Sequence, residues 1–254
     1  MKRITLGGPL AISLATGALC AGLLSAAPQP ARAAPLLHDS VAEFTRIVNR
    51  QAPGVAAGRS ILGKMFDNSL SISATSFFSL GLSPTASSGA ATQPFAAAPG
   101  ASLDFFIDAF RGITGGAFSE ATGTPTGHAE QADVYLGFNG GDWRRVGTIH
   151  NGHGLTPVAP DGRVLNADPI VAWSVLPQAT VAGGIAYSFA FTVTSGEWNT
   201  LRIVDGRAST GSGRDGFDIL ELELSSVVIP EPGTLFLLGA GLLGLGAARR
   251  RRTR

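Results

Sequence analysis

The stretch that decides the fold is Ile219-Leu220-Glu221-Leu222-Glu223-Leu224, near the C-terminal end of the chain. Three leucines alternate with two glutamates, so the apolar residues recur with a period of two. Successive side chains of a β-strand point to opposite faces, and this pattern therefore puts Leu220, Leu222 and Leu224 on one face. It predicts a strand with the leucines in a core and the carboxylates toward solvent.

The same period of two recurs upstream of this stretch. A hairpin is indicated where residues 133–138 and 143–149 flank the turn-forming residues Asn139-Gly140-Gly141-Asp142. The other alternating apolar positions are Leu70, Ile72, Ala74, Tyr187, Phe189, Phe191, Val193, Leu201 and Ile203. Short strands between Gly, Asp, Asn and Pro turns are typical of an all-β fold, an antiparallel two-sheet β-sandwich or jelly roll. An open barrel is the alternative.

Two segments do not fit a strand pattern. Ser40-Val41-Ala42-Glu43 has the spacing of a capping box, and Phe44, Ile47 and Val48 then fall on one helical face, so we expect one short N-terminal helix over residues 40–50. Residues 83–100 are rich in Ser, Thr, Ala, Pro and Gly. Such a composition predicts a loop or linker.

The N-terminal end has the three parts of a secretory signal peptide. Lys2 and Arg3 precede a largely apolar run over residues 6–27, and Ala31-Arg32-Ala33 supplies a small-x-small cleavage signal before Ala34. We therefore assign residues 1–33 to a signal peptide and begin the ectodomain at Ala34. Cys20, the single cysteine, follows Leu19 rather than the small residue of a lipoprotein signal, so the ectodomain over residues 34–229 has no thiol and no disulfide.

The C-terminal end has three parts in a fixed order. The motif Pro230-Glu231-Pro232-Gly233 comes first, an uncharged apolar segment over residues 234–248 follows, and residues 249–254 contain five arginines. The prolines and Gly233 keep the backbone of the motif extended and accessible. The apolar segment is expected to form a single transmembrane helix whose arginines stay on the cytoplasmic side.

This order, from Val228 through the motif to Arg252, strongly resembles the PEP-CTERM sorting signal of Gram-negative bacteria. The resemblance implies an exosortase as partner, removal of the tail, and a host that makes exopolysaccharide. It covers about a tenth of the chain and implies no activity for the ectodomain. We therefore expect a protein that is exported across the inner membrane and held there by its tail. It is then released to the cell surface or matrix.

Charge separates the ectodomain from the two ends. The whole chain has a net charge of +1, but residues 34–230 contain 11 lysines and arginines against 17 aspartates and glutamates, a net charge of −6. An acidic domain is a poor ligand for nucleic acid or for anionic membrane. We therefore expect neither partner for the ectodomain itself.

A glycine-rich acidic loop before the last strand is the candidate metal site. Calcium takes six to eight oxygen ligands from carboxylates and carbonyls in flexible loops, and Asp205, Asp215 and Asp218 are suitably placed along the chain. The loop resembles the structural calcium sites of carbohydrate-binding modules. The alternative is an ordinary Gly/Asp turn, since these residues favour turns for backbone reasons of their own.

Two further groups bear on function. Trp143, beside two arginines at a hairpin start, is the candidate for stacking on sugar rings, although β-sandwiches usually bury their aromatic residues. The acid pairs Asp104/Asp108 and Glu221/Glu223 suggest a glycoside hydrolase only weakly, because each pair looks like the polar face of a strand. We therefore expect a non-enzymatic structural or adhesive protein of the surface or exopolysaccharide matrix. A carbohydrate-binding module with structural calcium and a secreted polysaccharide hydrolase remain as alternatives.

Overall fold

The computed structural model describes residues 34–51, 55, 57–67, 71–72, 77–80, 101–122, 129–153, 155, 157, 159–206, 217–229 and 241. The predicted signal peptide, the linker over residues 83–100 and the tail beyond Ile229, apart from Gly241, lie outside these residues. No helix within the described part is long and apolar enough to cross a membrane.

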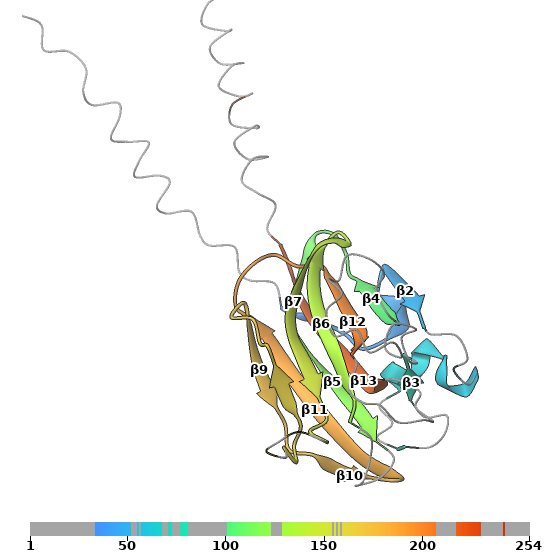
Figure 1. Ribbon diagram of the computed structural model, residues 1–254. Helices are drawn as coiled ribbons and strands as arrows, with labels where there is room; N and C mark the ends of the chain where they lie inside the picture. Colours follow the sequence, from blue (N-terminus) through green and yellow to red (C-terminus); the bar gives the residue numbers. More distant parts are fainter. Residues whose placement is uncertain are drawn as a thin grey trace, which may run out of the picture. The chain divides into compact units, whose positions relative to one another are not determined.

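Two antiparallel sheets form the fold, as the alternating patterns predict (Figure 1). In the first sheet the strand order is β1 (Leu36–His38), β13 (Asp218–Val228), β5 (Arg111–Thr122), β11 (Gly184–Val193) and β10 (Ala179–Val181). Two short strands join it, β3 (Phe78–Ser79) beside β13 and β9 (Val171–Val175) beside β11. In the second sheet the order is β2 (Arg46–Arg50), β4 (Ser102–Phe106), β12 (Thr200–Gly206), β6 (Gln131–Phe138), β7 (Gly141–His150) and β8 (Arg163–Leu165).

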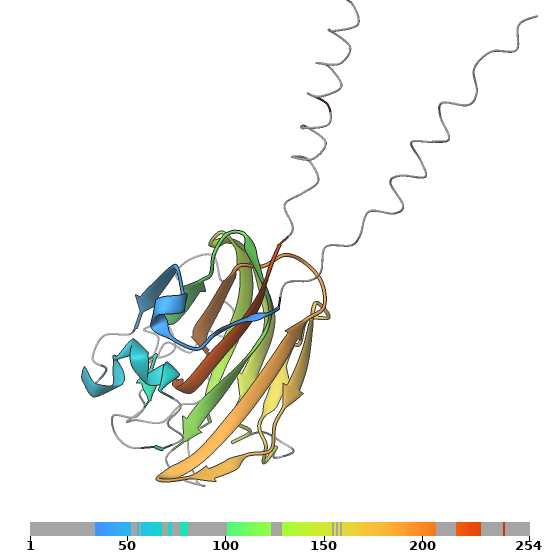
Figure 2. The same cartoon turned by 180° about the vertical axis from the view of Figure 1, so that it is seen from behind.

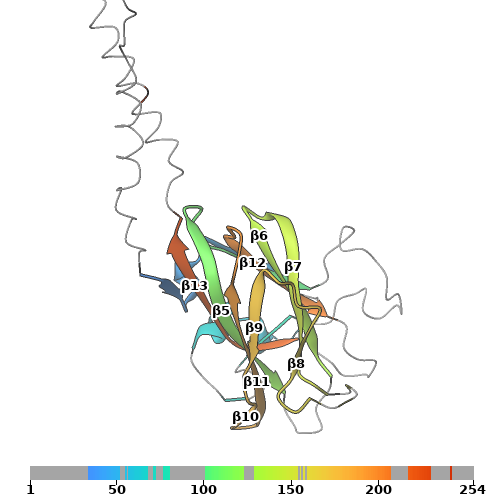
Figure 3. The same ribbon diagram turned by 90° about the vertical axis from the view of Figure 1, so that its left-hand side faces the viewer.

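The core lies between the two sheets. Phe118, Phe189 and Leu222 from the first sheet pack in one buried cluster with residues of the second sheet that include Phe105 and Leu201. Figure 3 shows the layers from the side, with β13 and β5 in one and β6 and β7 in the other. A two-sheet sandwich, rather than an open barrel, is therefore the observed architecture.

The hairpin between β6 and β7 forms where the turn residues predict it. Asn139 and Gly140 have φ values of 50° and 77°, the left-handed conformation that both central residues of a type I′ turn require. Asparagine and glycine adopt this conformation at least cost. The local sequence therefore fixes this connection.

The predicted helix over residues 40–50 is wrong. Glu43 does accept hydrogen bonds from the backbone N–H groups of Asp39 and Ser40, but the helical segment is a single 3-10 turn, η1 (Val41–Glu43). Phe44 then becomes extended, and Arg46–Arg50 pairs with β4 as strand β2 (Figure 2). The free edge of β4 offers backbone hydrogen bonds to this segment, and these stabilise a strand more than local propensity stabilises a helix.

Strand β13 is confirmed, but its register contains a bulge. The pairing with β5 shifts between Ile219 and Glu221, which turns Leu220 out of the main core. Leu220 packs instead in a second cluster with Phe77, Ala121 and Ala186, while Ile219, Leu222 and Leu224 join the main core. A bulge inserts one residue and reverses the alternation on one side of it. Two further 3-10 turns, η2 (Ala57–Arg59) and η3 (Leu62–Phe66), complete the described elements.

Candidate functional site

A buried cluster of acidic side chains lies at one end of the sandwich. Its members come from four different places: Glu120 on β5, Glu130 just before β6, Asp205 near the end of β12 and Asp218 at the start of β13. Glu120, Asp205 and Asp218 are buried residues, and the carboxyl group of Glu130 is buried as well. Carboxylates are almost never fully buried unless they are paired or hold a metal, so the cluster needs a physical explanation.

Strand register places Glu120 inside the sandwich. It pairs with Tyr187 on β11 and Ile219 on β13, and it lies two residues after the core residue Phe118, on the same face of β5. Asp205 is likewise two residues after Ile203 on β12. The alternation of each strand therefore carries a carboxylate into the interior where the apolar core ends.

The hydrogen bonding of the cluster is incomplete. Asn151 Nδ2 donates to Glu120 Oε1 at 3.5 Å, and the backbone N–H of Phe217 donates to Asp205 Oδ1 at 2.9 Å. Glu120 and Glu130 share a side-chain hydrogen bond, which requires a proton on one of them. When all carboxyl groups are ionised, Glu120 Oε2, Glu130 Oε2 and Asp218 Oδ1 are buried without a hydrogen-bond donor among the described residues. Such an orphaned atom costs about 1–3 kcal/mol, and more when it is charged.

Burial and mutual repulsion keep these acids from ionising. Burial raises the pKa of Glu120 to about 8, and the nearby charge of Asp218 adds to that rise. The pKa values of Glu130 and Asp218 are also well above their ordinary values, first because of burial and then because of neighbouring carboxylates. The positive charge of Arg59 opposes the rise at Asp218 only in part. These carboxyl groups therefore favour the protonated state unless a positive charge lies beside them.

The sequence predicted part of this cluster. Asp205 lies near enough to Asp218 for its charge to raise the pKa of Asp218, whereas Asp215 lies outside the described residues, so the calcium hypothesis stays a prediction. Glu120 and Glu130 were missed, although a glutamate on the inward register of β5 was the available signal. Among the described residues, no group of three or more His, Cys, Asp or Glu side chains is arranged so that it could hold a metal ion.

Trp143 is partly buried on the outer side of the second sheet. The guanidinium carbon of Arg202 lies 3.9 Å from its ring centre, a cation–π contact. A Cβ atom at Gly137 would meet the same ring at 2.8 Å, so the indole also lies tightly over β6. One face of the predicted sugar-stacking residue is thus occupied by protein.

The acid pair Asp104/Asp108 is not a strand's polar face. Asp104 is buried and is held by Arg202 through two hydrogen bonds of 2.5 and 2.7 Å and by Arg50 at 2.7 Å. Asp108 caps its own turn, with Oδ1 accepting from the backbone N–H of Phe110 at 2.8 Å. Glu221 and Glu223 are partly exposed on β13, as the alternation predicts.

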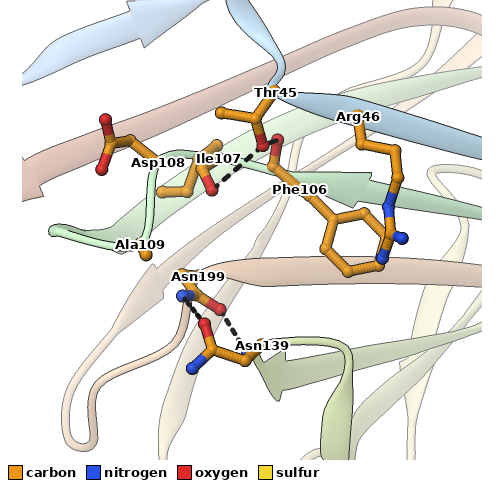
Figure 4. A pocket seen from close by; sticks show the side chains of 8 residues that line it. All are labelled: Thr45, Arg46, Phe106, Ile107, Asp108, Ala109, Asn139 and Asn199. Atoms are coloured by element: carbon orange, nitrogen blue, oxygen red, sulfur yellow. Dashed lines mark hydrogen bonds between the residues drawn. The ribbon is translucent and has the colours of Figure 1, made fainter.

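A pocket of about 430 Å³ is drawn in Figure 4. Its lining residue Asn199 directly precedes β12, whereas Asp205 of the acidic cluster lies near the end of that strand. Asn139 and Asn199 hydrogen-bond to one another across its floor, with Asn199 Nδ2 donating to Asn139 Oδ1 at 2.8 Å. Arg46 covers the ring of Phe106 at 3.8 Å. The remaining lining residues are Thr45, Ile107, Asp108 and Ala109. Amide, carboxylate and guanidinium groups beside one aromatic ring give the pocket both polar and apolar contacts.

The fold and these sites define a β-sandwich domain that runs directly into a C-terminal motif. The chain carries a PEP-CTERM protein-sorting motif, whose family matches residues 228–252, and the resemblance seen in the sequence is thereby confirmed. No curated protein matches the chain.

Among solved structures, six chains match. One of them is the C-terminal domain of a chitobiase from Bacteroides fragilis, with 11% identity, 73% of this chain and 93% of that chain covered, and a TM-score of 0.34. This likeness is too loose to carry an argument about function.

Proposed function

We propose that this protein is exported, held at the membrane by its C-terminal segment, and cut there by an exosortase. The observation that carries the proposal is the PEP-CTERM motif at residues 228–252. Strand β13 ends at Val228, and Ile229 still donates a backbone hydrogen bond to the carbonyl of Phe110 at 2.8 Å. The described residues of the domain therefore end at Ile229, directly before Pro230 of the motif.

The released sandwich is proposed to act as a structural or adhesive component of the cell surface or exopolysaccharide matrix, without catalysis. Supporting this, the acid pair Asp104/Asp108 has no free carboxylate at Asp104, because two arginines hold it. Glycoside hydrolysis needs two carboxylates across a cleft, one of which must exchange protons. The hydrolase alternative therefore loses one of the two acid pairs that motivated it, and the other, Glu221/Glu223, lies along a single strand rather than across a cleft.

A comparison of two host strains tests the export proposal. In the wild type, the protein is expected in the surface or medium fraction, cut near the motif. In a strain that lacks the exosortase it is expected in the membrane fraction at full length. A matched variant, Pro230→Ala with Pro232→Ala, should behave like the enzyme deletion if the motif is what the protease reads. Unchanged release in either strain would overturn the proposal.

Carbohydrate binding is the second candidate, and the pocket of Figure 4 favours it. Sugars are recognised chiefly by amide, carboxylate and guanidinium hydrogen bonds, and the pocket offers such groups from Asn139, Asp108 and Arg46, while Arg46 covers one face of the Phe106 ring. The test is retention of the protein on its host's purified exopolysaccharide and on a glycan array. Arg46→Ala should weaken retention, and Trp143→Ala should do so only if the sheet surface around Trp143, outside the pocket, also contributes.

Lys64→Ala is the matched control, because Lys64 pairs with Asp67 at the surface and does not line the pocket. If wild type and all variants are retained equally, the pocket does not bind the polysaccharide, and the structural role remains as the proposal. Turnover of the polysaccharide would instead favour the hydrolase.

A further inference from the structure

We propose that the end of the sandwich beside the sorting motif docks on the lipid surface, with the ring of Phe110 inserted among the lipids, while the tail holds the protein at the membrane. The surface that docks is called the apolar end patch and consists of Leu36, Leu37, Phe110, Phe138 and Val228. The proposal rests on the proposed membrane attachment of the C-terminal segment, and it adds a contact made by the folded domain itself.

The patch gathers exposed apolar side chains at one end of the fold. It contains five of the nine large apolar residues that the described part of the chain leaves exposed. Single exposed apolar residues are ordinary on a protein surface, whereas a group of them marks a contact surface. Figures 1 and 3 show the turn between β4 and β5, the turn between β6 and β7 and the last residues of β13 at this same end of the sandwich.

Contacts between the elements join the members of the patch. Val228 on β13 pairs with Arg111, the residue after Phe110, and Leu36 on β1 pairs with Ser226 of the same strand β13. The pocket of Figure 4 is lined both by Ala109, which precedes Phe110, and by Asn139, which follows Phe138. The patch therefore extends from the edge of the first sheet to the hairpin of the second.

The backbone holds Phe110, the most exposed member at 68%, in a fixed position. Its N–H donates to Asp108 Oδ1 at 2.8 Å, and its carbonyl oxygen accepts a hydrogen bond from the N–H of Ile229 at 2.8 Å. Turns usually carry small or polar residues, and an aromatic ring in this place suggests a role in contact. A turn that is already fixed loses little conformational entropy when the ring is buried by a partner. Phe110 is thus both preorganised and tied to the residue directly before the motif.

The length of chain beyond the domain selects the lipid surface as the partner. Residues 230–233 separate Ile229 from the apolar segment that begins at residue 234. At no more than about 3.6 Å per residue, Ile229 lies within about 18 Å of that segment. While the segment spans the membrane, Phe110 is therefore confined near the lipid. A short tether gives a high effective concentration, so a weak apolar contact persists until the tail is removed.

Charge near the patch fits apolar insertion rather than electrostatic attraction. Arg111 follows Phe110, and a side chain of this kind keeps its guanidinium group among the headgroups while a neighbouring aromatic ring enters the lipid. The domain over residues 34–230 has a net charge of −6, so it gains nothing from anionic lipid as a whole. Docking should therefore be insensitive to salt, which screens charges but not apolar contacts.

Site-specific fluorescence of the full-length protein in vesicles tests the proposal. Cys20→Ser removes the single thiol, and Phe110→Cys in that background carries an environment-sensitive nitrobenzoxadiazole label. The vesicles contain phosphatidylethanolamine and phosphatidylglycerol, with or without lipids that bear a nitroxide quencher in the acyl chain. Flotation with the vesicles reports attachment of the chain. The label at position 110 is expected to emit at shorter wavelength and to lose most of its emission to the quencher, at low and at high salt.

Leu176→Cys, labelled in the same way, is the matched control. Leu176 is an exposed apolar residue outside the patch, and its N–H donates to the carbonyl of Ser188 at 3.0 Å. Ser188 pairs with Ser119, which lies eight residues along β5 from Arg111, a span of about 26 Å. Its label should keep its emission in the presence of the quencher.

Val228→Asp, combined with the label at position 110, tests whether the patch rather than the tether makes the contact. The tether is unchanged in this variant, but a charge enters the patch beside Phe110, so most of the quenching should be lost. Val228 is exposed, and the domain should remain folded.

The outcomes separate docking from membrane attachment. Protein that does not float with the vesicles would overturn the membrane attachment and this proposal with it. Protein that floats but is quenched equally at positions 110 and 176 would overturn docking alone, as would full quenching in Val228→Asp. A wavelength shift at position 110 without quenching would show that protein, such as a second copy of the chain, covers the patch in place of lipid.

Discussion

Removing the carboxylate of Asp104 should destabilise the sandwich more than any other polar substitution on the second sheet. Asp104 is 1% exposed, and its partner Arg202 is 10% exposed at the side chain, so the bidentate pair between β4 and β12 is almost fully desolvated. Asp104→Ala leaves the Arg202 guanidinium buried without its counter-charge. Breaking a buried pair from one side costs about 3–5 kcal/mol.

The second arginine contributes much less. The side chain of Arg50 is 42% exposed, and an ion pair with an exposed partner adds about 0–1 kcal/mol. The expected total for Asp104→Ala is therefore about 4 kcal/mol. That is a large part of the roughly 5–15 kcal/mol by which a domain is stable.

Urea denaturation followed by tryptophan fluorescence measures this cost. With a slope of about 2 kcal/mol per molar, Asp104→Ala should lower the midpoint by about 2 M without changing the slope. Arg50→Ala is the matched control and should shift the midpoint by about 0.5 M or less. The double variant Asp104→Ala with Arg202→Met should recover much of the loss, because no buried charge remains unpaired. An Asp104→Ala midpoint equal to that of Arg50→Ala would refute the reasoning.

The remaining predictions concern β13, β5 and the acidic cluster. Leu222→Asp should abolish cooperative thermal unfolding, since an unpaired carboxylate in the core costs several kcal/mol. Glu221→Ala should lower the free energy of unfolding by about 0.5 kcal/mol or less. Equal melting temperatures for these two variants would contradict the register of β13. Gly116→Ala should cost about 1–3 kcal/mol in urea titrations because its Cβ would lie 2.6 Å from the Glu223 carbonyl oxygen, whereas Gly141→Ala, with its nearest atom at 3.8 Å, should be tolerated. The raised pKa of Glu120, about 8 against an ordinary 4.5, means that the native state keeps a proton which the unfolded chain has released. The free energy of unfolding should therefore fall as the pH rises from about 4.5 to about 8, by up to about 1.4 kcal/mol per pH unit for this group. Glu120→Gln should reduce this dependence but not abolish it, because Glu130 and Asp218 also have raised pKa values. A wild-type stability that rises over the same pH range would count against the buried state.

The sequence predicts most of the fold because its strands alternate strictly. Leu222 and Leu224 are in the core as expected, and Asn139-Gly140 makes the hairpin whose backbone it favours. Two local features are not predictable in this way. The bulge that turns Leu220 away arises from the pairing of β13 with β5, and the strand over residues 46–50 forms because β4 offers it an open edge. Both are set by partners far along the chain.

The residues of the candidate sites likewise include some that the sequence predicts and some that depend on distant parts of the chain. Asp205 and Asp218 stand out in the sequence because they flank a glycine-rich stretch. Glu120 and Glu130 join them only because the end of β5 lies beside the beginnings of β6 and β13. The buried state of Asp104 could not be predicted either, since its alternation resembles that of a solvated strand face and its burial depends on two arginines from β2 and β12.

Intact-mass analysis of the protein released by its native host is the most direct test of processing at both ends. We predict a mature chain that begins at Ala34 and lacks the apolar segment and the arginines from Leu235 to Arg254. Loss of the exosortase should leave the uncut chain in the membrane fraction. A released protein that still ends at Arg254 would contradict the assignment of this tail as a processed sorting signal.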